Sequence, residues 1–267
     1  SFKTIAALAF GIGLAGAAPA AFAQTPKNGG TLIYATGIDA QTLDPQFVTD
    51  IPTFRVVRYI YEPLTQQDAA GKVIPALATA WTLSDDKRTW TFQLRKGVKF
   101  HDGSVFDANA VKFTFDRLVD RATGSPRAST LAAVEQVKVV DDYTISITTK
   151  KPFAPLLAQL SAYNAAILSP AHVKKVGADL RKLPSGTGPF KFKSWQPGEK
   201  ITLVRNDDYW AGKARLDGLE VRAVPEDSAR VLMLMSGQVD VISGVPTVML
   251  KRLQSSSAVT MMRKTGY

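Results

Sequence analysis

The chain has 267 residues, of which 45% are hydrophobic and 21% are charged, and its formal net charge is +10. These proportions are those of a globular protein with a packed core and argue against a disordered chain. The absence of cysteine excludes disulfides, thiol catalysis and zinc sites built from cysteine. The basic residues are scattered among acidic ones, with no basic patch that interleaves aromatic residues, so we expect no nucleic-acid partner.

Residues 1–23 have the pattern of a secretory signal peptide. Lys3 is basic, Ile5 to Ala18 is an apolar run, and residues 21–23 form an A-x-A cleavage signal. We therefore expect an exported, periplasmic protein whose mature chain begins at Gln24. Glycines at 11, 13 and 16 match a dinucleotide-binding pattern, but this pattern lies inside the leader and follows no strand, so we expect no nucleotide cofactor.

Alternation and helical spacing predict the elements of the first half. We expect a strand at Thr31–Thr36, a helix at Phe54–Leu64 and a strand at Thr89–Arg95. Asp107 stands where the N-cap of a further helix should be, with Phe106 and Val111 placed as a hydrophobic staple.

The second half is predicted to alternate strands and helices in the same way. Its expected strands are Val134–Val140, Thr144–Thr149, Phe190–Trp195, Lys200–Arg205, Leu219–Val224 and Gln238–Ile242. Its expected helices are Pro152–Tyr163 and a helix that is capped by Asp227 or Ser228 and ends at Gly237. We expect the tryptophans at 81, 90, 195 and 210 to fill cores.

Several motifs resemble one known family. They are A-x-x-W from Ala78, W-T-F-x-L-R-x-G-V-K-F-x-D-G over 90–103, D-A-x-x-V over 107–111, P-x-G-T-G-P-F over 184–190, N-x-x-Y-W over 206–210 and L-x-S-G-x-x-D over 234–240. Together with the L-D-P loop at 43–45 and Y-E-P-L at 61–64, this series is similar to that of the family 5 bacterial extracellular solute-binding proteins. Those proteins are the dipeptide, oligopeptide, nickel and glutathione receptors of ABC importers.

The resemblance implies an α/β fold, namely lobe I of a periplasmic-binding-protein-like receptor with an inserted small α+β domain. Family members are about twice as long as this chain, so we expect lobe II to be missing from it. The implied organisation is a signal peptide at 1–23, the first part of lobe I at 24–64, the insert at 65–183, and the rest of lobe I up to the hinge at 184–267.

The function implied by the resemblance is capture of short peptides or glutathione-like peptides, which are delivered to the permease and ATPase subunits of an inner-membrane importer. The receptor is expected to be monomeric and to need no cofactor. An alternative is a receptor of the same class for a nickel or other metal chelate. A remoter alternative is a periplasmic peptidase, but the two histidines form no metal motif and no G-x-S-x-G elbow is present, so we expect no catalytic or metal-binding residues.

The resemblance also suggests ligand-binding residues. Thr49, Asp50 and Ile51 follow the L-D-P loop, and a second group follows the last predicted strand: Gly244, Val245 and Pro246. Arg127 is a further candidate, because its planar guanidinium could hold a ligand carboxylate by two parallel hydrogen bonds. The alternative for Arg127 is an ordinary arginine in a solvent-facing loop.

Overall fold

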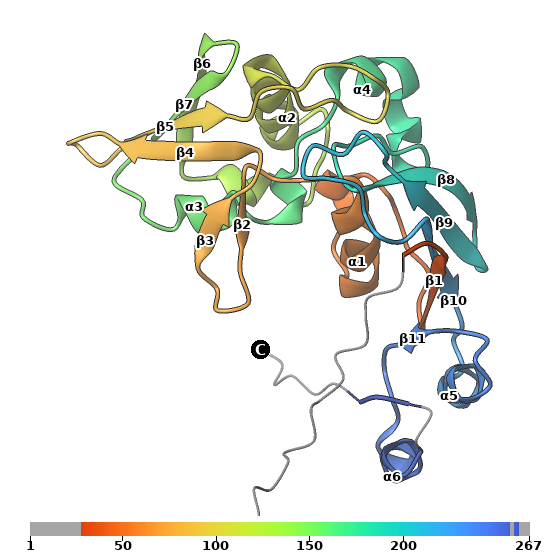
Figure 1. The fold of residues 1–267 in the computed structure, drawn as a ribbon. Helices are drawn as coiled ribbons and strands as arrows, with labels where there is room; N and C mark the ends of the chain where they lie inside the picture. The colour runs from red at the N-terminus through yellow and green to blue at the C-terminus, as the bar shows by residue number, and fades with distance from the viewer. Residues whose placement is uncertain (1–27, 257–258, 262–267) are drawn as a thin grey trace, which may run out of the picture.

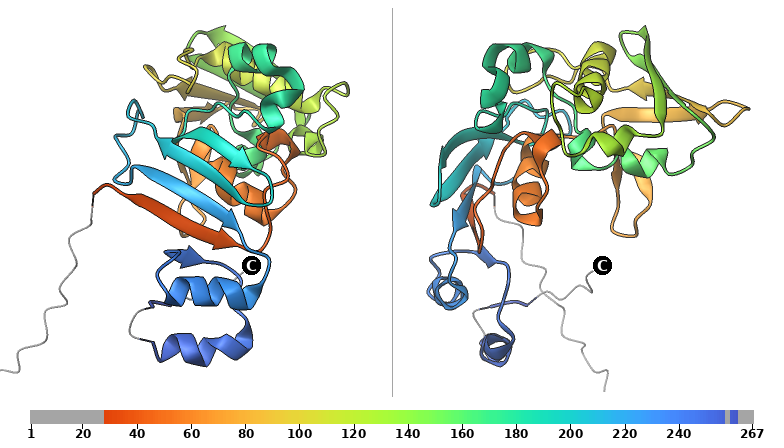
Figure 2. Two further views of the ribbon diagram at one scale, coloured as in Figure 1. Left: turned by 90° about the vertical axis from the view of Figure 1, so that its right-hand side faces the viewer. Right: turned by 180° about the vertical axis from the view of Figure 1, so that it is seen from behind.

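The computed structural model describes residues 28–256 and 259–261, and the predicted signal peptide lies outside these ranges. Figures 1 and 2 show two β-sheets on opposite sides of the molecule, with the helix α1 (Ile51–Ile60) between them. None of the helices in the described ranges is both long and apolar enough to cross a lipid bilayer.

The first sheet has five strands in the order β11-β1-β10-β9-β8. These are β1 (Thr31–Thr36), β8 (Phe190–Gln196), β9 (Lys200–Arg205), β10 (Gly218–Ala223) and β11 (Val241–Ile242). Strand β1 lies between β10 and β11 and runs parallel to both, whereas β9 is antiparallel to its two neighbours β10 and β8. The three parallel strands therefore end at the same edge of the sheet.

The second sheet is antiparallel and has the order β4-β5-β7-β6. Its strands are β4 (Ala78–Leu83), β5 (Thr89–Leu94), β6 (Val134–Asp141) and β7 (Thr144–Thr149), and a hairpin of β2 (Thr65–Gln67) and β3 (Val73–Pro75) precedes them. Helix α2 (Ala108–Val119) packs on this sheet and begins, as predicted, at an Asp107 N-cap that accepts from the Ala110 amide.

The remaining helices are short. They are α3 (Leu156–Gln159), α4 (Pro170–Val176), α5 (Asp227–Met235), α6 (Leu250–Gln254) and the 3-10 turns η1 (Pro45–Phe47), η2 (Ala128–Leu131), η3 (Tyr163–Ala165), η4 (Gly177–Arg181) and η5 (Thr247–Met249). Figure 2 shows α5 and α6 together at one end of the molecule, beyond β11.

Each sheet has its own core. The four-stranded sheet buries Phe92, Phe115 and Ile147 among others, whereas Val57 of α1 packs with Leu203 of the five-stranded sheet. All four tryptophans belong to these cores or pack against them, as predicted. Near residue 166 the buried residues pass from the core of the four-stranded sheet to the core of the five-stranded sheet. The domain boundaries expected at 64/65 and 183/184 stay predictions.

Two predicted helices are wrong in extent. Helix α1 begins at residue 51 because Asp50 caps it, and it ends at residue 60, ahead of Pro63, which disfavours helical backbone at the residue before it. The helix predicted at Pro152–Tyr163 is only the single turn α3, which begins after Pro155, a residue that disfavours helical backbone before it. Leu156 and Leu160 are its buried apolar residues.

Two further details near the end of the chain also differ. The N-cap of α5 is Glu226 rather than Asp227 or Ser228, because the Asp227 carboxylate is engaged by the Arg230 guanidinium. The strand predicted from Gln238 contains only residues 241–242, and the Asp240 side chain instead accepts the Ile33 amide at 2.7 Å. The helix stop at Gly237, which has φ +73°, is confirmed.

The L-D-P loop is fixed to α2 by a buried ion pair. The Arg117 guanidinium donates to Asp44 Oδ2 at 2.7 Å, and the two side chains are 16% and 1% exposed. Arg117 also donates to the Gln46 side-chain oxygen, and the Gln46 amide donates to the Thr114 carbonyl at 2.8 Å. Two motifs that are 73 residues apart therefore form one buried polar cluster.

The glycines of the 184–190 motif allow close approach to the end of α1. A Cβ at Gly188 would lie 2.5 Å from the Tyr59 carbonyl oxygen, and a Cβ at Gly186 would overlap the Ile60 carbonyl oxygen. Neither glycine has a positive φ, so packing rather than turn geometry requires them.

Glu62 of the Y-E-P-L motif is a buried carboxylate with three side-chain donors. Thr187 donates to it at 2.8 Å, Tyr209 at 2.7 Å and the Trp210 ring nitrogen at 2.9 Å. Burial raises the pKa of Glu62, although the bonds from Trp210, Tyr209 and Thr187 oppose the shift. The Arg95 guanidinium lies 3.9 Å from the centre of the Trp210 ring and adds positive charge nearby.

His101 is held as a neutral ring against the same glycine motif. Its Nε2 lies 2.9 Å from the Gly188 carbonyl, and its Nδ1 faces the Gly186 amide, which donates to it. The ring therefore donates through Nε2 and accepts at Nδ1, which leaves no place for a second proton. Burial lowers the pKa of His101 to about 4.

We expect Arg117→Met to lower the free energy of unfolding by about 3 to 5 kcal/mol, because it leaves the Asp44 carboxylate buried without its positively charged partner. Urea unfolding measures this change. The matched control is Lys112→Met, which removes an exposed ion pair with Asp116 and should cost about 0.5 kcal/mol at most. Equal effects of the two substitutions would contradict a buried, structural role for Arg117.

We expect acid to destabilise the fold between about pH 6.5 and pH 4 through His101. The unfolded histidine binds a proton near pH 6.5 and the folded one only near pH 4, so stability is complete above this window and falls by about 3 kcal/mol through it. His101→Gln keeps a donor for Gly188 but cannot titrate.

The difference in unfolding free energy between wild type and His101→Gln should therefore vary with pH inside this window and be constant above it. Glu62, whose raised pKa acts with the opposite sign, cancels in this difference because both proteins contain it. A difference that is flat from pH 7.5 to pH 4 would show that the ring titrates normally.

Candidate functional site

The candidate site is the edge at which β1, β10 and β11 end. In open α/β sheets, ligands bind outside the carboxyl ends of parallel strands. The segments that continue from these ends begin at Gly37, Val224 and Ser243. They are linked by hydrogen bonds, since the Val224 amide donates to the Thr36 carbonyl at 2.8 Å and the Ser243 amide to the Ala35 carbonyl at 3.2 Å.

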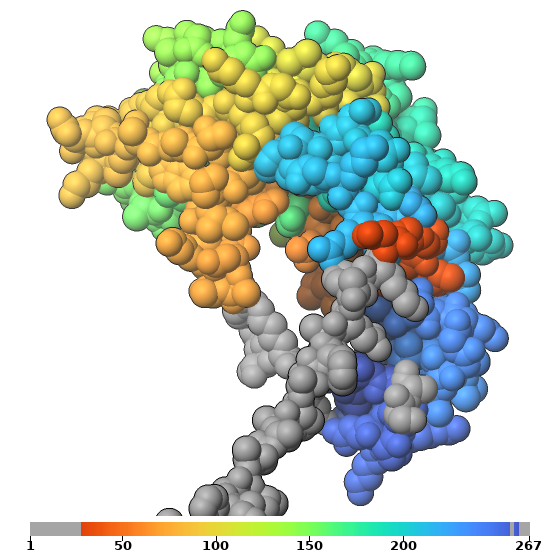
Figure 3. All heavy atoms as spheres, viewed as in Figure 1, coloured from red at the N-terminus to blue at the C-terminus, as the bar shows by residue number. Residues whose placement is uncertain are grey.

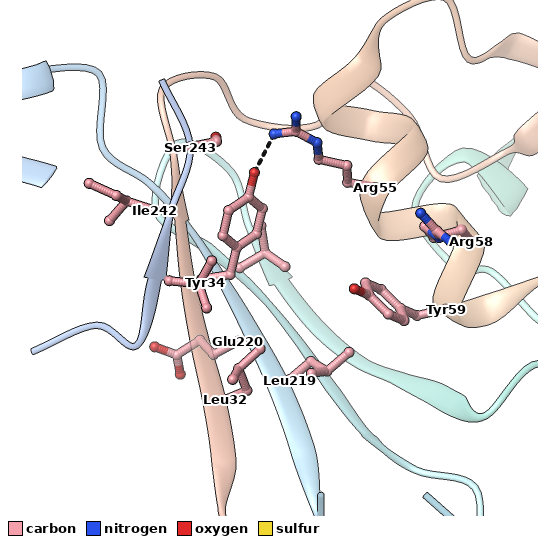
Figure 4. Close-up of a pocket in the computed structure, with 11 residues that line it drawn as sticks. Leu32, Tyr34, Arg55, Arg58, Tyr59, Leu219, Glu220, Ile242 and Ser243 are labelled. Carbon is pink, nitrogen blue, oxygen red and sulfur yellow. Dashed lines mark hydrogen bonds between the residues drawn. The ribbon is translucent and has the colours of Figure 1, made fainter. Parts of the chain in front are cut away.

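The N-terminus of α1 lies at this same edge. Figure 4 shows Arg55 beside Tyr34 and Ser243 at one end of a hollow, and Tyr59, Leu219 and Leu32 toward the other. Helix α1 therefore runs antiparallel to β1, and its first residues face the carboxyl edge. The positive end of its dipole favours a negatively charged ligand group there.

The hollow between α1 and the sheet has a volume of about 420 Å³. Its walls are mainly apolar, with Leu32, Leu219 and Val221 from the sheet. Arg55 lies at its upper end in Figure 4. The Arg55 guanidinium donates to the Tyr34 hydroxyl at 2.5 Å. This contact joins α1 to the end of β1.

The three predicted residues at the start of α1 have different surroundings. Thr49 is exposed and Ile51 is 67% exposed, so both side chains are free to meet a ligand. Asp50 caps the helix, with Oδ1 accepting from the Thr53 amide at 2.8 Å, and its Oδ2 is buried with no hydrogen-bond partner among the described residues. One of the two Asp50 oxygens is therefore committed to structure.

Arg127 lies against the start of α1 and not in a free loop. Its Nε donates to the Val48 carbonyl at 2.8 Å, and its guanidinium carbon lies 5.9 Å from the centre of the Phe54 ring. The structure thus brings together Arg127 and the 49–51 segment, which are far apart in sequence. Both terminal nitrogens of the Arg127 fork remain without a hydrogen-bond partner among the described residues.

Gly244, Val245 and Pro246 continue from β11 at the same edge. Gly244 has φ +71°, and its carbonyl accepts from the Arg230 guanidinium at 3.1 Å. Val245 and Pro246 are half-buried. No motif in the sequence marked Arg230, whose only signal is a basic residue inside an otherwise apolar helical pattern.

The described residues offer little chemistry of other kinds. No group of three or more histidine, aspartate or glutamate side chains among them could hold a metal ion. The Nε2 atoms of His101 and His172 contact the backbone carbonyls of Gly188 and Leu183 respectively. Figure 3 shows that the molecule is hollowed between the part bearing the β2–β3 hairpin and the part bearing α5 and α6.

Comparisons with known proteins show what this chain is similar to. A D,D-dipeptide-binding periplasmic protein described as probable, DdpA of Escherichia coli K12, is 34% identical over 251 residues, which are 90% of this chain and 48% of DdpA. The glutathione-binding protein GsiB of E. coli O6:K15:H31 is 32% identical over 94% of this chain and 49% of its own length.

A solved structure has the same fold. The periplasmic binding protein DppA of Helicobacter pylori, in complex with the peptide STSA, matches with a TM-score of 0.81 and 36% identity over 86% of this chain and 50% of DppA. The chain spans about half the length of these relatives. Residues 72–267 match the family described as "Bacterial extracellular solute-binding proteins, family 5 Middle". The chain belongs to the family 5 bacterial extracellular solute-binding proteins.

Proposed function

We propose that this chain forms lobe I of a periplasmic receptor that captures short peptides or glutathione-like peptides. The receptor delivers them to the permease and ATPase subunits of an ABC importer and acts as a monomer. In this proposal residues 1–23 are the export signal, residues 65–183 are a small domain inserted in lobe I, and a second lobe closes over the bound solute. Capture needs no cofactor and no chemical change in the solute.

One observation carries the proposal. The start of α1, Arg127 and the 244–246 segment all lie at the carboxyl edge of the parallel strands, in a chain whose relatives bind peptides and glutathione. A helix N-terminus and a guanidinium suit the carboxylate of a peptide. The exposed backbone of Gly244 suits the main chain of an extended ligand.

Isothermal titration of the full-length protein tests the proposal. The panel contains di-, tri- and tetrapeptides, glutathione and a nickel–histidine chelate, and recovered peptides are analysed by mass spectrometry. We expect heat of binding with at least one peptide or with glutathione, and intact peptide afterwards. Binding of the chelate alone would replace the peptide claim by the metal-chelate alternative, and cleaved peptide would favour a peptidase.

Arg127 should contribute to affinity through a ligand carboxylate. A charge-assisted hydrogen bond contributes about 1.5 to 3 kcal/mol, so we expect Arg127→Gln to weaken binding of a peptide with a free C-terminus by about 10- to 100-fold. The same peptide with an amidated C-terminus should lose little affinity on this substitution. Titration of both peptides against both proteins measures the difference.

The matched control for this prediction is Arg121→Gln, which removes an exposed arginine from the turn that precedes Arg127. We expect the control to bind both peptides as the wild type does. If Arg127→Gln weakened the free and the amidated peptide equally, Arg127 would act only through its contact with the Val48 carbonyl.

A further inference from the structure

Arg230 is a buried cation whose guanidinium is bonded almost entirely to backbone. The residue is 3% exposed and lies in the second turn of α5. It donates to four carbonyls: Val224 at 2.6 Å, Pro225 at 2.9 Å, Ser243 at 3.2 Å and Gly244 at 3.1 Å.

These carbonyls belong to two segments that are distant in sequence. Val224 and Pro225 lead out of β10, whereas Ser243 and Gly244 lead out of β11. The segment that leaves β1 passes close to the guanidinium as well, since a Cβ added at Gly37 would lie 3.0 Å from Arg230 Nη1. The guanidinium therefore lies where all three parallel strands end.

The geometry requires an arginine at this position. A guanidinium presents five donors in a rigid plane, so one side chain can bond two separate segments at once. The Asp227 carboxylate, on the same helix, balances the buried charge. An apolar replacement would leave four carbonyls without this donor, and a lysine, with three donors on one atom, could bond only part of the set.

We propose that Arg230 is a positioning residue for solute capture, because it fixes the 243–246 segment against the 224–225 segment. These two segments, here called the rim, therefore have a single shape before the solute arrives. This inference rests on the proposed function. A rim held in its bound conformation loses less conformational freedom when the ligand binds, which increases affinity. A rim released from Arg230 must be ordered by the ligand itself.

The test uses the full-length protein with Arg230→Met, Arg230→Lys and the control Arg222→Met. Arg222 is an arginine of the same strand end, but it is 30% exposed and pairs with Glu220 on its own strand. Binding of the best peptide is measured well below the melting temperature of each variant, where the unfolded fraction is negligible.

We expect Arg230→Met to weaken binding at least 10-fold, Arg230→Lys to restore part of the loss, and Arg222→Met to stay within 2-fold of the wild type. Hydrogen exchange on the ligand-free proteins gives a second readout. The amides of Val224 and Ser243, which bond to β1, should exchange faster in Arg230→Met, whereas those of β9 should not change. A general loss of stability would instead speed exchange in β9 as well.

The outcomes separate the two claims. If the wild type binds a peptide and both Arg230 variants bind within 2-fold of it with unchanged exchange at Val224 and Ser243, the role of Arg230 is overturned and the proposed function stands. If the wild type binds nothing in the panel, the proposed function fails and the capture role fails with it. If Arg230→Met does not fold, the result with Arg230→Lys decides in the same way.

Discussion

The buried carboxylate of Glu62 is the contact on which the arrangement of the two sheets depends. It follows the end of α1, which packs on the five-stranded sheet, and it accepts from Thr187, Tyr209 and Trp210. Trp210 packs in turn against the core of the four-stranded sheet. A buried carboxylate is unfavourable unless its oxygens are satisfied, so the three donors must stay in place together. Glu62 thus joins the two sheets through one small cluster of polar side chains.

This rigid junction and the site lie at opposite ends of α1. Glu62 and the glycine motif hold its C-terminal end, while Asp50 and Arg127 lie at its N-terminal end. A rigid element fixed at one end can present a site at the other with little loss of precision. The segments that follow the parallel strands form the other side of the site, because the ends of these strands meet at one edge.

Periodicity and capping predicted much of the fold. The strand at 31–36, the Asp107 cap, the 190–205 hairpin and the stop at Gly237 all follow from local patterns. The capping pattern failed at α5, where Arg230, three residues further along the same helix, engages Asp227 and Glu226 takes the N-cap position. The motif letters marked Glu62 and the glycines of 186–188, but only the fold shows that they meet. The candidate site was predicted by resemblance, and the neighbourhood of Arg127 and the 49–51 segment needed three-dimensional proximity that no local pattern contains.

The central claim is that solute binds at the carboxyl edge of β1, β10 and β11. A crystal structure of the full-length protein with its best peptide tests this most directly. The account predicts ligand atoms within hydrogen-bond distance of the 49–51 segment, Arg127 or the 244–246 segment, with the 224–225 and 243–246 segments still joined by Arg230. A peptide bound wholly on the four-stranded sheet, with the carboxyl edge empty, would contradict it.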